Sequence, residues 1–396
     1  MPQTQPLTVE QIRQDIRILD EELNRYWNLG KNLVLGWCPA DSGLQALVVP
    51  HYFLPDIAAQ RFHLLYGRRE MSLRQFDRVA VMFNTAGVAI GLPHVDWDRP
   101  ALARAIEPVL HRYSVTRTEF RAGILFDIVD LASTTAVDQV TQLNSLSYAV
   151  NVAQSRLQQA GIEVDLARSS TPTGLLAWNR QEGLRADVNL YCLMALALAE
   201  NALARAKGDR HTAPELRACF DIAHTYDYHQ PQGLSPTIQS CITGELTRRL
   251  GVMRGAARPG QILIGHFQRP NSDLPVEPNV LYKMTDVARF LALADRSLSQ
   301  LNSLQLSGDR IVSIKAYLTG EQIEGGFFSI KQYSVSDEFG TKATVFNAKV
   351  NIERDSGKPV YLGRQNKELD GYGFEAVPFD VAAPSKDFIV RLNEAA

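Results

Sequence analysis

The chain of 396 residues lacks the features that assign many sequences to a class at once. Its four cysteines, Cys38, Cys192, Cys219 and Cys241, contain no CxxC pair, so neither a zinc site nor a disulfide framework is indicated. A formal net charge of −2 gives no basic footprint for nucleic acid. The sequence also has no GxxxxGK[ST] phosphate loop, no GxSxG elbow and no HExxH pair. These absences disfavour secreted disulfide scaffolds, zinc proteins and nucleic-acid binders.

Long hydrophobic runs are missing as well. The most apolar stretch, 188–206, is interrupted by Asn189, Glu200, Asn201 and Arg205, which predicts a buried helix and no membrane span. The first residues are polar and have no apolar core of the kind found in signal peptides. Together with the dispersed cysteines, this predicts a cytoplasmic location.

What is present is the balance of a globular protein, with 45% hydrophobic and 21% charged residues. The chain is long enough for two or three domains. Its patterns predict a helical and α/β region over 1–115 and a second α/β segment over 116–304. After residue 305 apolar and polar residues alternate between Gly, Asp and Ser turns, which predicts a β-rich domain over 305–396.

The first predicted element is a helix over 8–29. Its apolar residues recur at steps of four and three, at Ile12, Ile16, Leu19, Leu23 and Tyr26. This spacing favours an amphipathic helix packed on its own domain, and a short dimerising coil is the alternative.

The middle segment predicts a strand, a helix, a hairpin, a second helix, a strand, a short helix and a final strand. These elements are expected in turn at 122–126, 133–160, 162–166 with 174–178, 188–206, 216–225, 245–255 and 261–265.

Residues 244–263 read GELTRRLGVMRGAARPGQIL. This stretch resembles the segment that follows the catalytic hairpin in class III nucleotidyl cyclases, which reads roughly G-D-x-V-N-x-A-x-R-L and, a few residues on, P-G-Q-I-L. The order of elements over 116–270 is similar to the cyclase catalytic domain too. The resemblance implies an α+β sandwich of that type, a homodimer, a nucleotide ligand, and Mg²⁺ or Mn²⁺ as cofactor.

The spacing of the segment matches that of the family, but several of the family's functional residues are replaced in this chain. Where the family places an Asn and an Arg that contact the ribose and the phosphates, this chain has Arg248 and Val252. Asp127 matches the first of the two metal-binding aspartates, whereas Thr173 stands in the place of the second. A neutral hydroxyl cannot replace a carboxylate for a hard divalent cation.

Two further positions correspond to the family's base-selecting residues, and they hold Ser169 and Cys241. Cys241 resembles the residue of guanylate cyclases, but Ser169 lacks the carboxylate that reads guanine. A small cysteine buried in a strand is the alternative interpretation of Cys241.

Charged pairs offer two more candidate sites. Arg248 and Arg249 open the predicted helix at 245–255, where they either bind phosphate or form a solvated helix start. Asp127 and Asp130 either hold one metal ion between them or cap the helix that begins near Ser133.

The sequence therefore predicts a cyclase-like signalling or regulatory protein, a pseudo-cyclase that dimerises and binds a nucleotide without converting it. An active cyclase that uses Asp127, Asp130 and Arg248 is one alternative, in which a nucleoside triphosphate becomes a 3′,5′-cyclic nucleotide. A chain that supplies one face of a heterodimer is another. The terminal domains would then bind a protein partner.

Overall fold

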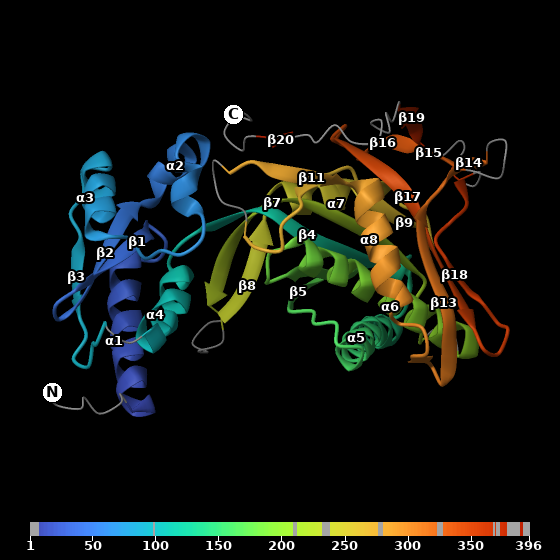
Figure 1. Cartoon of the computed structure of the whole chain (residues 1–396), viewed down its shortest axis with the longest axis horizontal. Coiled ribbons are helices and arrows are strands. Elements are labelled where there is room, and N and C mark those ends of the chain that lie inside the picture. The colour runs from blue at the N-terminus through green and yellow to red at the C-terminus, as the bar shows by residue number, and fades with distance from the viewer. Residues whose placement is uncertain are drawn as a thin grey trace. The chain divides into compact units, whose positions relative to one another are not determined.

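The structure is a computed structural model that describes residues 8–97, 100–208, 212–231, 238–275, 280–322, 328–366, 369, 373–377 and 389–390 (Figure 1). The chain divides into two compact units. Within the described residues, the first unit comprises 8–118 and 226–243, and the second comprises 119–225 and the chain from 244 onward. No helix in these ranges is both long and apolar enough to cross a membrane.

The first unit is a three-layer α/β structure around a small antiparallel sheet of order β1-β2-β3. Its elements are α1 (Val9–Trp27), β1 (Asn32–Ala40), β2 (Gly43–Pro50), η1 (His51–Phe53), α2 (Leu54–Gln60), η2 (Phe62–Leu65), α3 (Leu73–Met82), β3 (Val88–Gly91) and α4 (Pro100–Arg112). One face of the sheet packs on α1 and α4, and the other packs on α2 and α3. The hairpin of β7 (Leu216–Pro231) and β8 (Ile238–Thr243) also belongs to this unit from residue 226.

The burial of the apolar residues of α1 bears on the two interpretations of their spacing. Thr8 caps the helix, since its side chain accepts a hydrogen bond from the Gln11 amide. Leu19 and Leu23 are fully buried, and they belong to a core formed with residues of α4 and the sheet. Leu19 and Leu23 are therefore used inside the unit, which supports the packed amphipathic helix, whereas Ile12, Ile16 and Tyr26 are only partly buried.

The second unit is built on a mixed sheet whose strands run in the order β12-β13-β17-β9-β7-β4-β6-β5. Its elements are β4 (Thr116–Ile128), η3 (Leu131–Ser133), α5 (Ala136–Gln159), β5 (Leu166–Thr171), β6 (Gly174–Asn179), α6 (Leu184–Lys207), β7 (Leu216–Pro231), α7 (Glu245–Ala256), β9 (Ile262–Gly265), β10 (Gln268–Pro270), β11 (Tyr282–Asp286), α8 (Val287–Ser299), β12 (Gln305–Leu306), β13 (Asp309–Leu318), β14 (Gly320–Gln322), β15 (Phe328–Ile330), β16 (Gln332–Ser336), β17 (Lys342–Arg354), β18 (Val360–Leu362), β19 (Glu375–Val377) and β20 (Ile389–Val390).

Side-chain alternation assigns the two faces of this sheet. On β4 and β7 the even-numbered residues, among them Phe126 and Phe220, enter the main core with α5, α6 and α8. The odd-numbered residues point to the opposite face. A Cβ atom on Gly123 of β4 would come within 2.9 Å of the Leu246 side chain, so α7 lies on that face. The mixed α/β architecture expected from the sequence is present.

The C-terminal strands differ from the expected separate domain. Strand β17 pairs with β9, with Phe346 opposite Ile264, and β13 pairs with β17. The sheet therefore continues across the expected boundary at residue 304. Alternating apolar and polar residues predict a strand but not the sheet that it joins, because the pairing is set by distant backbone groups.

The first strand of the predicted hairpin is also displaced. It was expected at 162–166, and β5 instead spans Leu166–Thr171. Because β5 ends the order of the sheet, its residues Arg168, Ser169 and Ser170 are partly or fully exposed, and their polarity hides the strand from a hydrophobic pattern.

Candidate functional site

Asp127 is the centre of a charged cluster at the end of β4. Its side chain is only 2% exposed. Oδ2 accepts a hydrogen bond of 2.6 Å from Nε of Arg217, and Oδ1 accepts one from the hydroxyl of Thr173. A guanidinium nitrogen of Arg254 lies 3.7 Å from Oδ1. Both oxygens of this buried carboxylate therefore have protein partners, and the partner at Oδ2 is a cation.

Thr173 is placed by the tight turn between β5 and β6. Its carbonyl accepts a hydrogen bond of 2.8 Å from the amide of Ile128, which fixes the turn against the end of β4. The next residue must be glycine, because a Cβ atom on Gly174 would lie 2.1 Å from the carbonyl oxygen of Phe126. Arg254 also donates to the Thr173 hydroxyl, at 3.3 Å. The structure thus brings together Asp127 and Thr173, the two residues that the sequence resemblance places at the positions of metal-binding aspartates.

The two arginines near Asp127 come from strand β7 and helix α7. Arg217 lies on β7, the sheet neighbour of β4, and a second nitrogen of its guanidinium donates to the carbonyl of Ala257 at 2.9 Å. Arg254 lies near the end of α7, and 42% of its side chain is exposed. Arg217 hydrogen-bonds both Asp127 and Ala257 through its guanidinium, and it lies closer to Asp127 than Arg254 does.

A second buried ion pair lies further along β7. Asp221 is completely buried, and its carboxylate oxygens lie 2.8 Å and 3.1 Å from two nitrogens of Arg249. Arg249 also donates to the carbonyl of His266 at 2.6 Å. Gly265 on β9 leaves room for this carboxylate, since a Cβ atom there would come within 2.2 Å of it. Burial raises the pKa of Asp221 to about 7, against the opposing effect of Arg249.

Arg248 points away from this pair and is exposed at the start of α7. Its Nε donates to Glu245 at 2.8 Å, on the same turn of the helix. The hydrogen bond from Arg248 lowers the pKa of Glu245. A phosphate at this position would have to compete with Glu245 for the guanidinium. Arg249, in contrast, has a structural partner in Asp221.

The remaining predicted site residues lie apart from the Asp127 cluster. Asp130 is exposed, has φ of 54°, and precedes η3, where its side chain makes no capping hydrogen bond. Thr135 caps α5 in its place. Ser169 is half-buried on β5, opposite Leu176 of β6. Cys241 is buried on β8, opposite Tyr228, and belongs to the first unit, as expected for a strand cysteine.

These residues do not fit the divalent cation that the resemblance implies. Mg²⁺ and Mn²⁺ favour several oxygen ligands, carboxylates above all. Over the described ranges, no three His, Cys, Asp or Glu side chains come together as a metal site. At Asp127 a guanidinium takes the place that the cation would need, and Asp130 turns outward at a left-handed residue. The shared metal role of Asp127 and Asp130 stays a prediction that this geometry does not favour.

Sequence reasoning missed Arg217, Asp221 and Arg254. A signal for two of them is visible, because Arg217, Cys219 and Asp221 alternate with the apolar residues of a buried strand. Such polar residues on a strand imply a second polar face. That this face meets Asp127 depends on β7 lying beside β4, which the local sequence does not encode.

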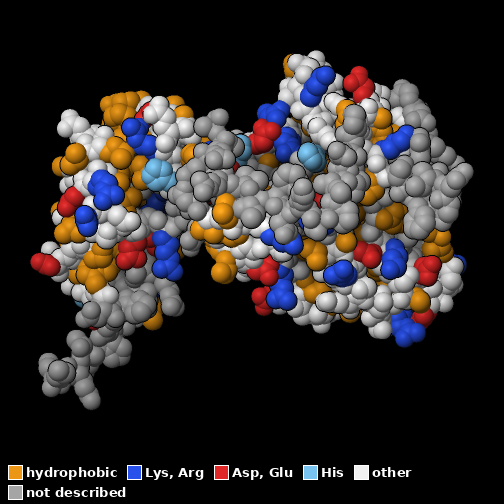
Figure 2. All heavy atoms as spheres, turned by 45° about the horizontal axis from the view of Figure 1, so that its top comes forward, with side chains coloured by type: hydrophobic (Ala, Val, Ile, Leu, Met, Phe, Trp, Pro, Cys, Tyr) orange, Lys and Arg blue, Asp and Glu red, His pale blue; other side chains and the backbone are white. Residues whose placement is uncertain are grey.

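Charge elsewhere is mixed. On the face drawn in Figure 2, Lys and Arg side chains are interspersed with Asp and Glu, and neither sign forms a continuous field there.

Comparisons with known proteins point to cyclase domains at low similarity. No protein-family model matches the chain, and no curated protein matches it. The guanylate cyclase domain of RhGC from Catenaria anguillulae, in complex with GTP, is 13% identical over 39% of this chain and 88% of its own, with a TM-score of 0.29. The adenylyl cyclase CyaB from P. aeruginosa is 12% identical over 59% of this chain and 95% of its own, with a TM-score of 0.33.

A dimeric guanylyl cyclase domain of the RhoGC fusion protein from the aquatic fungus Blastocladiella emersonii is 12% identical. It covers 39% of this chain and 89% of its own, with a TM-score of 0.28. Part of this chain is thus similar to cyclase domains, and at such TM-scores the likeness carries no inference about activity.

Proposed function

We propose that this protein is a cyclase-like regulatory protein that does not convert nucleotides, because arginine has replaced the cation at its former metal position. The observation that carries the proposal is the 2.6 Å hydrogen bond from Arg217 to the buried carboxylate of Asp127. The sequence resemblance of residues 244–263 to class III cyclases supports the cyclase-like part.

The arginine is an effective substitute for charge and a poor one for catalysis. A guanidinium neutralises Asp127 and donates directional hydrogen bonds, but it cannot activate a ribose hydroxyl or bridge phosphate oxygens as a bound cation does. Thr173 completes the substitution, since its hydroxyl satisfies the oxygen of Asp127 that Arg217 does not reach. Admitting Mg²⁺ would require Arg217 to leave a buried carboxylate, at a cost of about 1 to 3 kcal/mol.

Nucleotide binding without turnover is the second part of the proposal. Arg248 is an exposed cation in the first turn of α7, where backbone amides also favour anions. Its pair with Glu245 weakens but does not block this site, because a surface ion pair contributes only about 0 to 1 kcal/mol. A nucleotide phosphate can therefore displace Glu245.

Partners belong to the proposal as well. Because Leu19 and Leu23 of α1 are buried inside the first unit, a homodimer would need an interface that does not depend on them. Light scattering on the full chain should give twice the chain mass, and a monomer at high micromolar concentration would contradict this part. A heterodimeric role, or a protein partner of the first unit, would then take its place.

The decisive experiment is a search for product. The full chain is incubated with ATP, GTP, CTP or UTP and with Mg²⁺ or Mn²⁺, and cyclic nucleotides are measured by mass spectrometry. No product is expected, since loss of one electrostatic stabiliser can reduce a rate roughly a hundred- to a thousandfold and several are missing. Product that is lost in Asp127→Ala but kept in Asp165→Ala, an exposed control, would establish the active-cyclase alternative instead.

Calorimetric titration tests the binding part. Replacing Arg248 with Gln should weaken nucleotide affinity about ten- to a hundredfold, because a charge-assisted contact of roughly 1.5 to 3 kcal/mol is lost. Arg310→Gln, on an exposed arginine paired with Asp355, is the matched control. Affinity that is unchanged by EDTA supports the absence of a cation, whereas affinity that requires Mn²⁺ contradicts it.

A further inference from the structure

A cavity of about 330 Å³ lies in the first unit. It is bordered by β1, by the segment 63–71 and by α3, all of which belong to this unit. The volume is near the lower end of small-molecule sites. The cavity is therefore sized for a small metabolite, and its lining indicates which kind.

One wall is an extended segment that is fixed to β1. The amide of Trp37 donates to the carbonyl of Arg69 at 2.8 Å, and the amide of Met71 donates to the carbonyl of Trp37 at 2.7 Å. Arg69 is 1% exposed, and its guanidinium donates to three backbone carbonyls inside the unit. Because side chains alternate along an extended segment, Arg68 and Glu70 face away from this buried guanidinium. Both are exposed, and both line the cavity.

Another wall is one side of α3. Ser72 caps this helix, since its side chain accepts a hydrogen bond from the amide of Gln75. The lining residues of the helix are Gln75, Arg78, Val79 and Met82. Their steps of three, one and three place them on the same side of the helix, so α3 presents one polar, one cationic and two apolar side chains to the cavity.

The lining also contains a group of apolar side chains. Leu35 and Val79 are buried, Leu64 and Met71 are partly buried, and Met82 is 45% exposed. Methionine is flexible and polarizable, so Met71 and Met82 can adapt to the shape of an apolar group. The cavity can therefore remove the apolar body of a ligand from water.

Two arginines in the lining have no protein partner. Over the described residues, neither Arg68 nor Arg78 makes a hydrogen bond or an ion pair, and both are exposed. Glu70 is the sole carboxylate among the described lining residues, so with His63 neutral the lining carries a net charge of +1. A monoanion neutralises this charge, whereas a dianion leaves an excess of negative charge.

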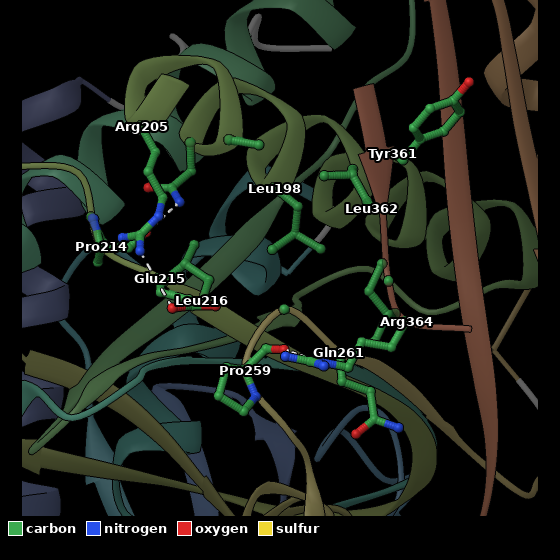
Figure 3. A pocket seen from close by; sticks show the side chains of 15 residues that line it. Leu198, Arg205, Pro214, Glu215, Leu216, Pro259, Gln261, Tyr361, Leu362 and Arg364 are labelled. Atoms are coloured by element: carbon green, nitrogen blue, oxygen red, sulfur yellow. Dashed lines mark hydrogen bonds and ion pairs between the residues drawn. The ribbon is translucent and has the colours of Figure 1, made fainter. Parts of the chain in front are cut away.

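The arginines of a cavity of similar size in the second unit differ in this respect. That cavity, of about 290 Å³, lies beside the last turns of α6 (Figure 3). Its Arg205 pairs with Glu215 at 3.3 Å, and its Arg364 donates to the carbonyl of Pro259. Those cations are held by the walls of their own cavity, so the cavity of the first unit offers the more accessible positive charge.

We propose that the cavity of the first unit binds a small monocarboxylic acid with an apolar body. Its carboxylate pairs with the arginines that lack partners, and its body packs on Leu35, Val79 and the two methionines. Guanidinium groups suit a carboxylate because their N–H donors are arranged in a planar fork. The inference rests on the first unit alone and does not depend on the proposed function.

Four ligands test the charge and the body separately on the full chain, by calorimetry. 3-Phenylpropanoate has both features and should bind. 3-Phenylpropanamide lacks the charge and propanoate lacks the ring, so each should bind at least about tenfold more weakly. 3-Phenylpropylamine carries the opposite charge and should not bind. The affinity of the acid should also fall as salt is added, because both arginines are exposed.

Matched substitutions at exposed residues place the binding in the cavity. Met82→Glu adds a carboxylate to the lining and should weaken 3-phenylpropanoate at least about tenfold, while Val81→Glu adds the same charge outside the lining and should have a smaller effect. Arg78→Gln should weaken the acid about three- to tenfold, whereas Arg74→Gln, one turn earlier and outside the lining, should leave its affinity unchanged. Glu70→Gln removes a repulsion and should strengthen binding about two- to fivefold.

Three results would overturn the proposal. The first is that 3-phenylpropanoate does not bind at millimolar concentration, and the second is that the acid and its amide bind alike. The third is that Met82→Glu and Val81→Glu reduce the affinity equally, which would place the ligand outside this cavity.

Discussion

Two polar sites of the second unit differ in whether their buried polar atoms have hydrogen-bond partners. In the Asp127 cluster, a carboxylate that is 2% exposed has a protein donor at each oxygen. In the cavity beside α6, Asn201 is 4% exposed and its Oδ1 has no donor among the described residues. A buried polar group is most stable when it is paired, so the Asp127 cluster is complete in itself, whereas Oδ1 of Asn201 is an unsatisfied acceptor. The position that resembles a catalytic centre is thus the closed one.

The two sites are connected through the chain. The segment before β7 lines the cavity with Glu215 and Leu216, and the next residue, Arg217, holds Asp127. On the other side, Ala257 accepts from Arg217, and Pro259 and Gly260 line the cavity. Both segments are shared, so a substitution that displaces the cavity walls is expected to displace the partners of Asp127 as well.

The largest effect is expected from the buried pair on β7. Arg249→Gln leaves Asp221, which is fully buried, without its cation, and breaking such a pair costs about 3 to 5 kcal/mol. The cost depends on pH, because a protonated Asp221 needs no cation. Urea denaturation should show a loss of about 1 kcal/mol at pH 5 and the full loss at pH 9.

The unaltered chain sets the sign of this pH dependence. The folded pKa of Asp221 is raised to about 7 by burial, above the value of an unfolded aspartate. Its contribution to stability is therefore complete below pH ~4 and is lost as pH rises through about 7. A loss of about 3 to 5 kcal/mol at both pH values would mean that Asp221 stays ionised throughout, and a loss of about 1 kcal/mol at both would mean that it stays protonated.

An intermediate effect is expected at the Asp127 cluster. Arg217→Ser removes the donor to Oδ2, which should cost about 1 to 3 kcal/mol, and it opens space beside a buried carboxylate. Mn²⁺ should then raise the midpoint of thermal unfolding of the variant and not that of the unaltered chain. Arg254→Ser is the matched control, since its guanidinium is 3.7 Å from Asp127 and its side chain is 42% exposed. If the unaltered chain responds to Mn²⁺ as strongly as Arg217→Ser, the closed cluster is wrong.

Much of this fold was predictable from the sequence, because most helices and strands are encoded by the pattern of residues within each segment. The helices and most strands of residues 116–270 follow hydrophobic periodicity, and the positions of Asp127 and of the turn at Thr173 were singled out through the resemblance to class III cyclases. The partners of Asp127 were not found, because Arg217 is ninety positions away in sequence and reaches it only through the order of strands. The unpaired Asn201 was unpredictable for the same reason. In the sequence it reads only as a polar interruption of an apolar helix.

The smallest effect is expected in the cavity beside α6, and it separates empty space from packed core. Ala202→Phe adds a ring where the structure has about 290 Å³ of space, so the free energy of unfolding should change by less than about 1 kcal/mol. Ala199→Phe makes the same change one helical turn earlier, at a residue that is 0% exposed. There the ring has no room, and overpacking should cost about 1 to 3 kcal/mol or more. Urea denaturation of both variants measures the difference, and equal losses would show that the walls beside α6 close on each other in solution.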